Sequence, residues 1–281
     1  MNAIGHVTGA GPVPVRKTTA AAAGTVPSPP APTARRQVAF GRPKSGAGHR
    51  VLLYGPGGIG KTTLAAALPG PVAFFDLDES LGRLGIGAQT VEAAAWADLR
   101  AALAADGWDG VGSIVIDTAT KAEELAVEHT LANTLQDGKR STSVEGFGYG
   151  KGYGYVFDTF LPLLADLDRH ARAGRHVCLI CHDCTSTVPN PAGEDWLRYE
   201  PRLQSPNSGK ASIRLRVREW ADHVLFVGYD VAVDKDGKGR GAGTRTLYRA
   251  EFPHCMAKSR TGADPIPLDG DGAAVWAEII R

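Results

Sequence analysis

The sequence predicts an α/β fold: a mainly parallel β-sheet flanked by helices, with an antiparallel hairpin near the C-terminus. Three patterns predict this fold. A short apolar run at residues 51–54 leads into a glycine-rich loop and then a helical segment. Apolar runs that suit buried strands then alternate with helical segments, which is typical of a parallel sheet. Two late strand-like runs, 223–230 and 244–251, bracket a Lys-, Gly- and Asp-rich connection, as in a hairpin.

Residues 1–48 are expected to form a disordered basic tail, and residues 49–281 one folded domain. The tail is rich in Ala, Pro and Gly and lacks hydrophobic periodicity, so it cannot bury enough surface to offset chain entropy. Seven of the 31 Lys and Arg residues, but none of the 30 Asp and Glu residues, lie in residues 1–50, which leaves the rest with a net charge of −6. The tail is interpreted either as a linker or as a weak contact for nucleic acid.

No apolar stretch approaches the ~18 residues that a membrane helix needs. We therefore expect no membrane partner and a cytoplasmic location.

Residues 55–62, GPGGIGKT, match the phosphate-binding pattern G-x-x-x-x-G-K-[ST] at each fixed position. The order of strand, loop and helix is the context that this motif requires. Loop N–H groups can turn toward an anion, and the following helix adds the positive end of its dipole. Lys61 would contact the β- and γ-phosphates, and the Thr62 hydroxyl would bind Mg²⁺. The expected nucleotide-binding residues are Gly55, Pro56, Gly57, Gly58, Ile59, Gly60, Lys61, Thr62 and Thr63.

The next strand, residues 72–76, ends in the acidic run DLDE, which includes Asp78 and Glu79. In open α/β sheets ligands bind at the carboxyl ends of the strands, so these acids are expected to face the nucleotide. A helix is expected over residues 90–105, with Thr90 as its cap.

Residues 113–118, SIVIDT, form the next expected strand, and a helix follows over residues 119–136. Four apolar-biased residues followed by Asp are the Walker B arrangement, in which a carboxylate at a strand end orients the water shell of Mg²⁺. Asp117 is therefore the second expected magnesium residue.

Residues 137–154 break all periodicity before a helix expected at 155–173. Glycines there alternate with Phe147, Tyr149 and Tyr153 around Lys151. Rings interleaved with a cation suit the stacking of single-stranded nucleic acid, but an ordinary flexible loop fits equally well.

The strand expected at residues 176–181 ends at His182 and contains Cys178 and Cys181, with Cys184 close behind. These thiols and His182 suggest a zinc site. However, residues three apart on a strand point to opposite sheet faces, so we expect reduced, buried thiols instead. A long loop is expected over residues 184–212 and contains Trp196, Arg198, Tyr199 and Arg202. A helix at residues 273–280 ends the chain.

Together, residues 50 to about 267 resemble the RecA-type ATPase core, and most closely the small phage-encoded RecA-like ATP-binding proteins of single-strand annealing and recombination. The resemblance implies that Asp78 positions the attacking water, with Glu79 as its substitute, and that Asp117 binds the magnesium ion. His182 stands where RecA itself has the glutamine that senses the γ-phosphate.

The same resemblance gives the aromatic and basic residues of both loops a role in DNA binding. It also implies that Lys258 and Arg260, a K-x-[KR] pair, enter the ATP site of a neighbouring subunit. The implied partners are single-stranded DNA, further copies of this chain in a ring or filament, and a single-stranded DNA-binding protein.

The predicted function is therefore a DNA-stimulated ATPase that uses ATP and Mg²⁺ and acts on single-stranded DNA in recombination or annealing. The alternative is a nucleotide-driven assembly or remodelling ATPase without DNA binding. A small-molecule kinase is less favoured, because no arginine-rich lid follows the Walker B helix.

Overall fold

The computed structural model describes residues 41, 46–207, 209–233 and 239–280. Apart from residues 41 and 46–48, the predicted tail lies outside the described residues. The described residues from 46 onward belong to one compact unit. No helix among the described residues is both long and apolar enough to cross a membrane.

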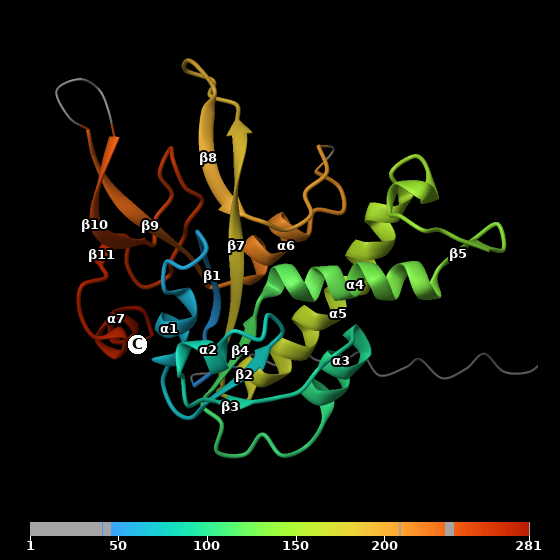
Figure 1. Cartoon of the computed structure of the whole chain (residues 1–281), viewed down its shortest axis with the longest axis horizontal. Coiled ribbons are helices and arrows are strands. Elements are labelled where there is room, and N and C mark those ends of the chain that lie inside the picture. The colour runs from blue at the N-terminus through green and yellow to red at the C-terminus, as the bar shows by residue number, and fades with distance from the viewer. Residues whose placement is uncertain (1–40, 42–45, 208, 234–238, 281) are drawn as a thin grey trace, which may run out of the picture. The chain divides into compact units, whose positions relative to one another are not determined.

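A nine-stranded sheet is the centre of the described part of the chain (Figure 1). The strands follow the order β11-β10-β9-β1-β7-β4-β2-β3, and β8 pairs with β7 outside this path. Neighbours from β9 to β3 are parallel, whereas β8, β10 and β11 pair antiparallel. The prediction of a mainly parallel sheet with an antiparallel C-terminal hairpin is therefore confirmed. The strands are β1 (Arg50–Gly55), β2 (Val72–Asp76), β3 (Gln89–Thr90), β4 (Ser113–Asp117), β7 (His176–Val188), β8 (Trp196–Pro201), β9 (His223–Val233), β10 (Gly239–Tyr248) and β11 (Ile266–Pro267).

Helices cover both faces of the sheet, because side chains alternate along strands that are apolar on both sides. On β1, Leu52 belongs to one core and Leu53 to the other. The first core contains Phe160 and lies under α3, α4, α5 and α6, whereas the second contains Trp276 and lies under α1, α2 and α7 (Figure 1). These helices are α1 (Lys61–Ala66), α2 (Leu81–Leu84), α3 (Trp96–Ala104), α4 (Ala119–Asn133), α5 (Lys151–Arg172), α6 (Ile213–Trp220) and α7 (Gly272–Ile279).

The helix expected over residues 90–105 begins later than predicted, at Trp96. Thr90 belongs to β3 and pairs with Phe74 of β2, and the N–H of Val91 donates to the carbonyl of Phe74 at 2.7 Å. The helix is capped instead where the Asp98 carboxylate accepts the backbone N–H of Ala95 at 2.9 Å. Thr90, which would suit a helix N-terminus, is thus part of the edge strand of the sheet.

The region from 134 to 154 is more ordered than predicted. Two short strands, β5 (Leu135–Gln136) and β6 (Lys139–Arg140), pair with each other, and a 3₁₀ turn, η1 (Glu145–Phe147), follows. The helix α5 then begins at Lys151 rather than at residue 155.

The long loop expected over residues 184–212 is mostly a hairpin. Strand β7 continues past the sheet to Val188 and pairs antiparallel with β8, so that Val188 lies opposite Trp196. In Figure 1 both strands project beyond the sheet at its carboxyl edge, where β1 ends and the glycine-rich loop begins. On the buried half of β7, Cys178 and Cys181 lie in opposite cores, as their spacing predicts.

Candidate active site

The glycine-rich loop, residues 55–62, joins β1 to α1 at the carboxyl edge of the parallel strands. Close packing fixes both ends of the loop. A Cβ on Gly55 would lie 2.3 Å from the carbonyl oxygen of Val227, and Gly60 caps α1 with a φ of +101°. Ile59 is buried between these two points. The loop therefore presents its backbone N–H groups in a fixed curve, which is the arrangement that holds phosphate groups.

Lys61 lies at the start of α1, and its ammonium group reaches back over the loop. Its Nζ donates to the carbonyl oxygens of Gly55 at 2.7 Å and Pro56 at 2.8 Å. Burial lowers the pKa of Lys61, although the charges of Asp183 and Asp117 oppose the shift. A phosphate oxygen that replaced either carbonyl would meet a cation that is already positioned and poorly hydrated.

Thr62 and Asp117 form the second part of the site. The Thr62 hydroxyl donates to Oδ2 of Asp117 at 2.7 Å, and Asp117 is buried at the end of β4. Burial raises the pKa of Asp117 to about 6, and the charges of Asp78 and Asp76 add to this, against the hydrogen bond from Thr62. A buried carboxylate beside a hydroxyl offers the hard oxygen ligands that Mg²⁺ prefers, so these residues fit the ion.

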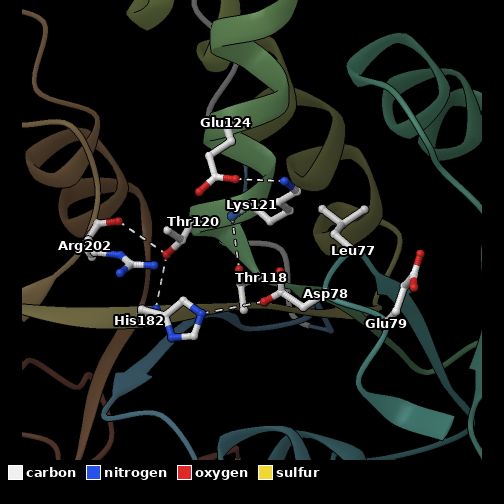
Figure 2. Close-up of a pocket in the computed structure, with 9 residues that line it drawn as sticks. All are labelled: Leu77, Asp78, Glu79, Thr118, Thr120, Lys121, Glu124, His182 and Arg202. Carbon is white, nitrogen blue, oxygen red and sulfur yellow. Dashed lines mark hydrogen bonds and ion pairs between the residues drawn. The ribbon is translucent and has the colours of Figure 1, made fainter.

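The acidic residues after β2 divide according to their surroundings. Asp76 accepts the N–H groups of Ser80 at 2.9 Å and Leu81 at 3.0 Å, and is therefore used to hold α2. Asp78 faces His182, with 3.7 Å between its Oδ2 and Nε2 of the imidazole. Glu79 has a left-handed φ of +51° and points away from both, as Figure 2 shows. Of the two carboxylates that the sequence left open, Asp78 is the one that faces the site.

His182 ends the buried part of β7, between β1 and β4. Its backbone N–H donates to the Thr120 hydroxyl at 3.2 Å. Burial lowers the pKa of His182, and the positive charges of Lys61 and Arg202 lower it further. These surroundings disfavour the protonated imidazole, and the neutral ring can offer a polar contact without a charge.

A cavity of about 370 Å³ brings the predicted residues together. It runs along the glycine-rich loop and α1 and is also lined by Asp78, Asp117 and His182. A second cavity of about 300 Å³ adjoins it and shares Asp78 and His182 with it (Figure 2).

Sequence reasoning missed two features of this region. Arg245 of β10 supports the loop from behind, since its Nη1 donates to the carbonyl of Ile59 at 2.6 Å. Arg202 lines the second cavity, and its predicted contact with DNA stays a prediction. Only the pairing of β8 back onto β7 brings Arg202 to this place, and no local motif indicates it.

Of the first set of predicted DNA-binding residues, at 147–153, only some are exposed and free to contact DNA. Phe147 is fully buried and meets Tyr155 edge to face at 5.1 Å, so the prediction that it stacks on bases is wrong. The Tyr153 hydroxyl donates to Glu145 at 2.9 Å. Lys151 is exposed on the first turn of α5, and Tyr149 is fully exposed before it.

The second set lies on the hairpin. Arg198 is buried and forms ion pairs with Glu200 and Glu251, so the prediction that it contacts DNA phosphates is also wrong. Trp196 and Tyr199 keep 40% of their surface exposed. One face of the Tyr199 ring stacks on Phe226, with the ring centroids 5.2 Å apart.

Lys258 and Arg260 lie at the amino ends of the strands, away from the chain's own glycine-rich loop. The backbone of Lys258 pairs with that of Val224 near the start of β9, and Nε of Arg260 donates to Asp222 at 2.9 Å. Their predicted contact with a neighbouring subunit stays a prediction.

The fold and the phosphate-binding loop define a P-loop nucleotide-binding domain. A family model described as an AAA domain matches residues 47–261, which is more than half of the chain. The chain therefore belongs to the AAA domain family, whose members are nucleotide-binding ATPase-type domains. No curated protein matches the chain.

Proposed function

We propose that the protein is an Mg²⁺-dependent ATPase that acts on single-stranded DNA in recombination or strand annealing. The observation that supports this most is the course of the β7–β8 hairpin. Strand β7 leaves the nucleotide cavity at His182, and the chain returns from β8 to the adjoining cavity at Arg202. Between these points β8 exposes Trp196 and Tyr199. The resemblance to RecA-like proteins of annealing and recombination supports the same function.

Hydrolysis would use the residues of the first cavity. The loop N–H groups and Lys61 bind the β- and γ-phosphates, and Thr62 and Asp117 hold the magnesium ion. When bound, the ion neutralises negative charge on the phosphate oxygens. Asp78 orients the attacking water and accepts its proton, as a carboxylate within reach of the γ-phosphate can.

The hairpin would connect hydrolysis to DNA. Its strands are paired from Asp183 to Val188, so a displacement at its base is carried to its tip. Loss of the γ-phosphate changes what His182 contacts, and His182 is directly continuous with the hairpin. The nucleotide state can therefore change the position of the aromatic residues on β8.

The exposed aromatic residues would supply the contact with DNA. Trp196 and Tyr199 on the hairpin, and Tyr149 on the turn before α5, can stack on unpaired bases, and stacking is worth about 1–3 kcal/mol per base in any sequence. Lys151 would add a phosphate contact, which weakens as salt rises.

Filter binding of labelled single-stranded DNA, with and without ATP and Mg²⁺, tests the proposal. We expect ATP-dependent binding by the full chain and also by a shortened protein that begins at Ser45, which lacks most of the basic tail. Trp196→Ala should weaken binding by about 1–3 kcal/mol. The matched control is Leu135→Ala, which removes an exposed apolar side chain from β5, outside the hairpin. No DNA binding by the shortened protein with ATP and Mg²⁺ at low salt would overturn the DNA part of the proposal.

A second candidate is an assembly or remodelling ATPase without DNA binding. Its specific support is the exposure of aliphatic side chains, 69% for Leu197 on β8 and 62% for Val231 on β9. Exposed aliphatic groups suit a protein contact better than base stacking. Two results together would favour this function. DNA would neither bind to the protein nor stimulate its ATP hydrolysis, and Leu197→Asp would lose self-association.

A further inference from the structure

The backbone of Arg202 is held between the two elements that end at the nucleotide cavity. Its N–H donates to the carbonyl of His182 at 2.8 Å, and its own carbonyl accepts the Thr120 hydroxyl at 3.3 Å. The Cys181 thiol also donates to this carbonyl, at 3.7 Å. Arg202 is therefore fixed beside the end of β7 and the start of α4, whatever its side chain does.

The side chain of Arg202 lines the cavity that adjoins the nucleotide cavity (Figure 2). None of the ion pairs between described residues includes it. Of the three carboxylates that line the same cavity, Glu124 pairs with Lys121 at 2.9 Å, Asp78 faces His182, and Glu79 points away. Arg202 thus brings to this cavity a positive charge that forms no ion pair with a described carboxylate.

The other arginines of this region behave differently. Arg198 and Arg214 both pair with Glu200, and both are largely buried. Their charges are used to fasten β8 to α6. Arg202 has no such structural use among the described residues, and this leaves its guanidinium available to a ligand.

We propose that Arg202 contacts the γ-phosphoryl group during hydrolysis and stabilises its transition state from within the same chain. This inference rests on the proposed ATPase activity and assigns a further catalytic residue to it. In the step, the water oxygen bonds to the γ-phosphorus and the bond to the β–γ bridging oxygen breaks. The water proton passes to Asp78, and the products are ADP and inorganic phosphate.

Physical chemistry favours a guanidinium at this point. The transferring phosphoryl group spreads negative charge over three oxygens, and a planar fork of N–H donors matches two of them at once. The field of Arg202 reaches the site, because its charge lowers the pKa of His182, although burial is the larger cause. The positive charge of Arg202, which disfavours a protonated His182, must favour a negatively charged phosphoryl group at the same place.

The first test is ATP hydrolysis without DNA, at low protein concentration. We expect Arg202→Ala to lower kcat by about 10²–10³-fold, as for loss of one donor to a developing charge. Arg202→Lys should be intermediate, since it keeps the charge but loses the fork. Arg140→Ala, at an exposed arginine on β6, is the matched control and should leave kcat unchanged. Thermal unfolding checks that the variants are folded.

The second test is nucleotide affinity, which does not depend on turnover. Arg202→Ala should bind ADP like the wild type but bind ADP with aluminium fluoride, a transition-state analogue, more weakly by about the factor lost in kcat. An unchanged affinity for the analogue, or an unchanged kcat, would overturn the role of Arg202 while leaving the ATPase in place. If the wild type itself hydrolyses no ATP with Mg²⁺, the proposed function and this inference both fail.

Mixing separates a contribution within the chain from one between chains. If Arg202 acts within its own chain, each variant chain, Arg202→Ala or Lys61→Ala, carries a damaged site that a neighbouring chain cannot complete. We therefore expect no recovery of hydrolysis in their mixture at any ratio. Recovery would show that Arg202 reaches a neighbour's nucleotide, and would overturn the inference as stated.

Discussion

Three aspartates lie close together at the nucleotide site, and their different contacts separate their roles. Asp76 holds the N-terminus of α2 through backbone N–H groups. Asp117 is buried against Thr62, and burial favours the protonated form of its carboxyl group. A cation bound beside it would favour the charged form instead. Asp78 remains half-exposed and faces the open cavity. Only the last of these can meet a water molecule at the γ-phosphate.

From these surroundings we predict separable effects of two substitutions. Asp117→Asn should weaken nucleotide binding that depends on Mg²⁺, because it removes the charge from the metal ligand. Asp78→Asn should spare binding and lower kcat, because loss of a general base acts on the transition state alone. Titration with a fluorescent nucleotide, with and without Mg²⁺, and steady-state kinetics measure the two effects.

Glu79→Gln is the matched control for Asp78→Asn, since Glu79 is the adjacent carboxylate and points away from the site. Turnover that survives Asp78→Asn but is lost in Glu79→Gln would move the base by one residue. Equal Mg²⁺-dependent affinities for the wild type and Asp117→Asn would remove Asp117 from the metal.

At the scale of the elements, local patterns predict the buried strands and the phosphate-binding loop well. Three strands lie as expected: those at 51–54 and 72–76 and the one that ends at Asp117. Their short, continuous apolar runs are typical of parallel strands that are buried on both faces of a sheet. Asp78, Asp117 and His182 are also found together, since each lies at or near the carboxyl end of the buried part of a parallel strand, and these ends meet at one edge of the sheet.

The remaining errors arise where a distant partner decides the structure. Thr90 suits a helix cap, yet it pairs with Phe74 in the sheet. Arg198 reads as a solvent-exposed cation until Glu200 and Glu251 are placed beside it. No local signal in the sequence reports these pairings.

Phe147 and Tyr149 offer a direct comparison between a core residue and a surface residue on the same turn. Phe147→Ala should destabilise the fold by about 3–5 kcal/mol, the cost of removing a buried aromatic ring. Tyr149→Ala should leave stability unchanged, because its side chain is fully exposed, and should weaken single-stranded DNA binding instead. Chemical denaturation and filter binding measure the two outcomes. Equal stability of the two variants would contradict the packing seen for η1 against α5.

Glu123 makes the link between α4 and the segment after β8 sensitive to pH. Its carboxylate accepts the N–H of Gln204 at 2.8 Å, and burial raises the pKa of Glu123 to about 7, against an ordinary value of 4.5. A carboxyl group whose pKa is raised by folding contributes stability that is present below about pH 4.5. That contribution is lost as the pH rises through about 7.

Glu123→Gln keeps an acceptor for Gln204 without the charge. We therefore expect the melting temperature of this variant to rise relative to the wild type as the pH is raised from 5 to 8. Because other groups titrate equally in both proteins, the difference between their melting temperatures isolates Glu123. A difference that does not change with pH would contradict the raised pKa.

At the scale of the whole molecule, the two ends of the parallel strands carry different chemistry. The phosphate-binding loop follows the carboxyl end of β1, whereas Lys258 and Arg260 lie at the amino ends of β1 and β9. A neighbour's Arg260 could reach the loop only if copies of the chain pack head to tail. Such packing generates rings when it closes and filaments when it does not.

Arg202 within the chain and Arg260 from a neighbour would then act at different stages. We expect hydrolysis without DNA to need only Arg202, and the additional rate with single-stranded DNA to rise with protein concentration as assemblies form. Mixing Lys61→Ala with Arg260→Ala should partly restore the DNA-stimulated rate, because mixed assemblies contain one intact composite site. Mixing Lys61→Ala with Asp117→Asn is the control and should restore nothing, since both damage the same chain's site. If the first mixture shows no recovery although both variants assemble on DNA, Arg260 does not enter a neighbour's site and each chain hydrolyses ATP alone.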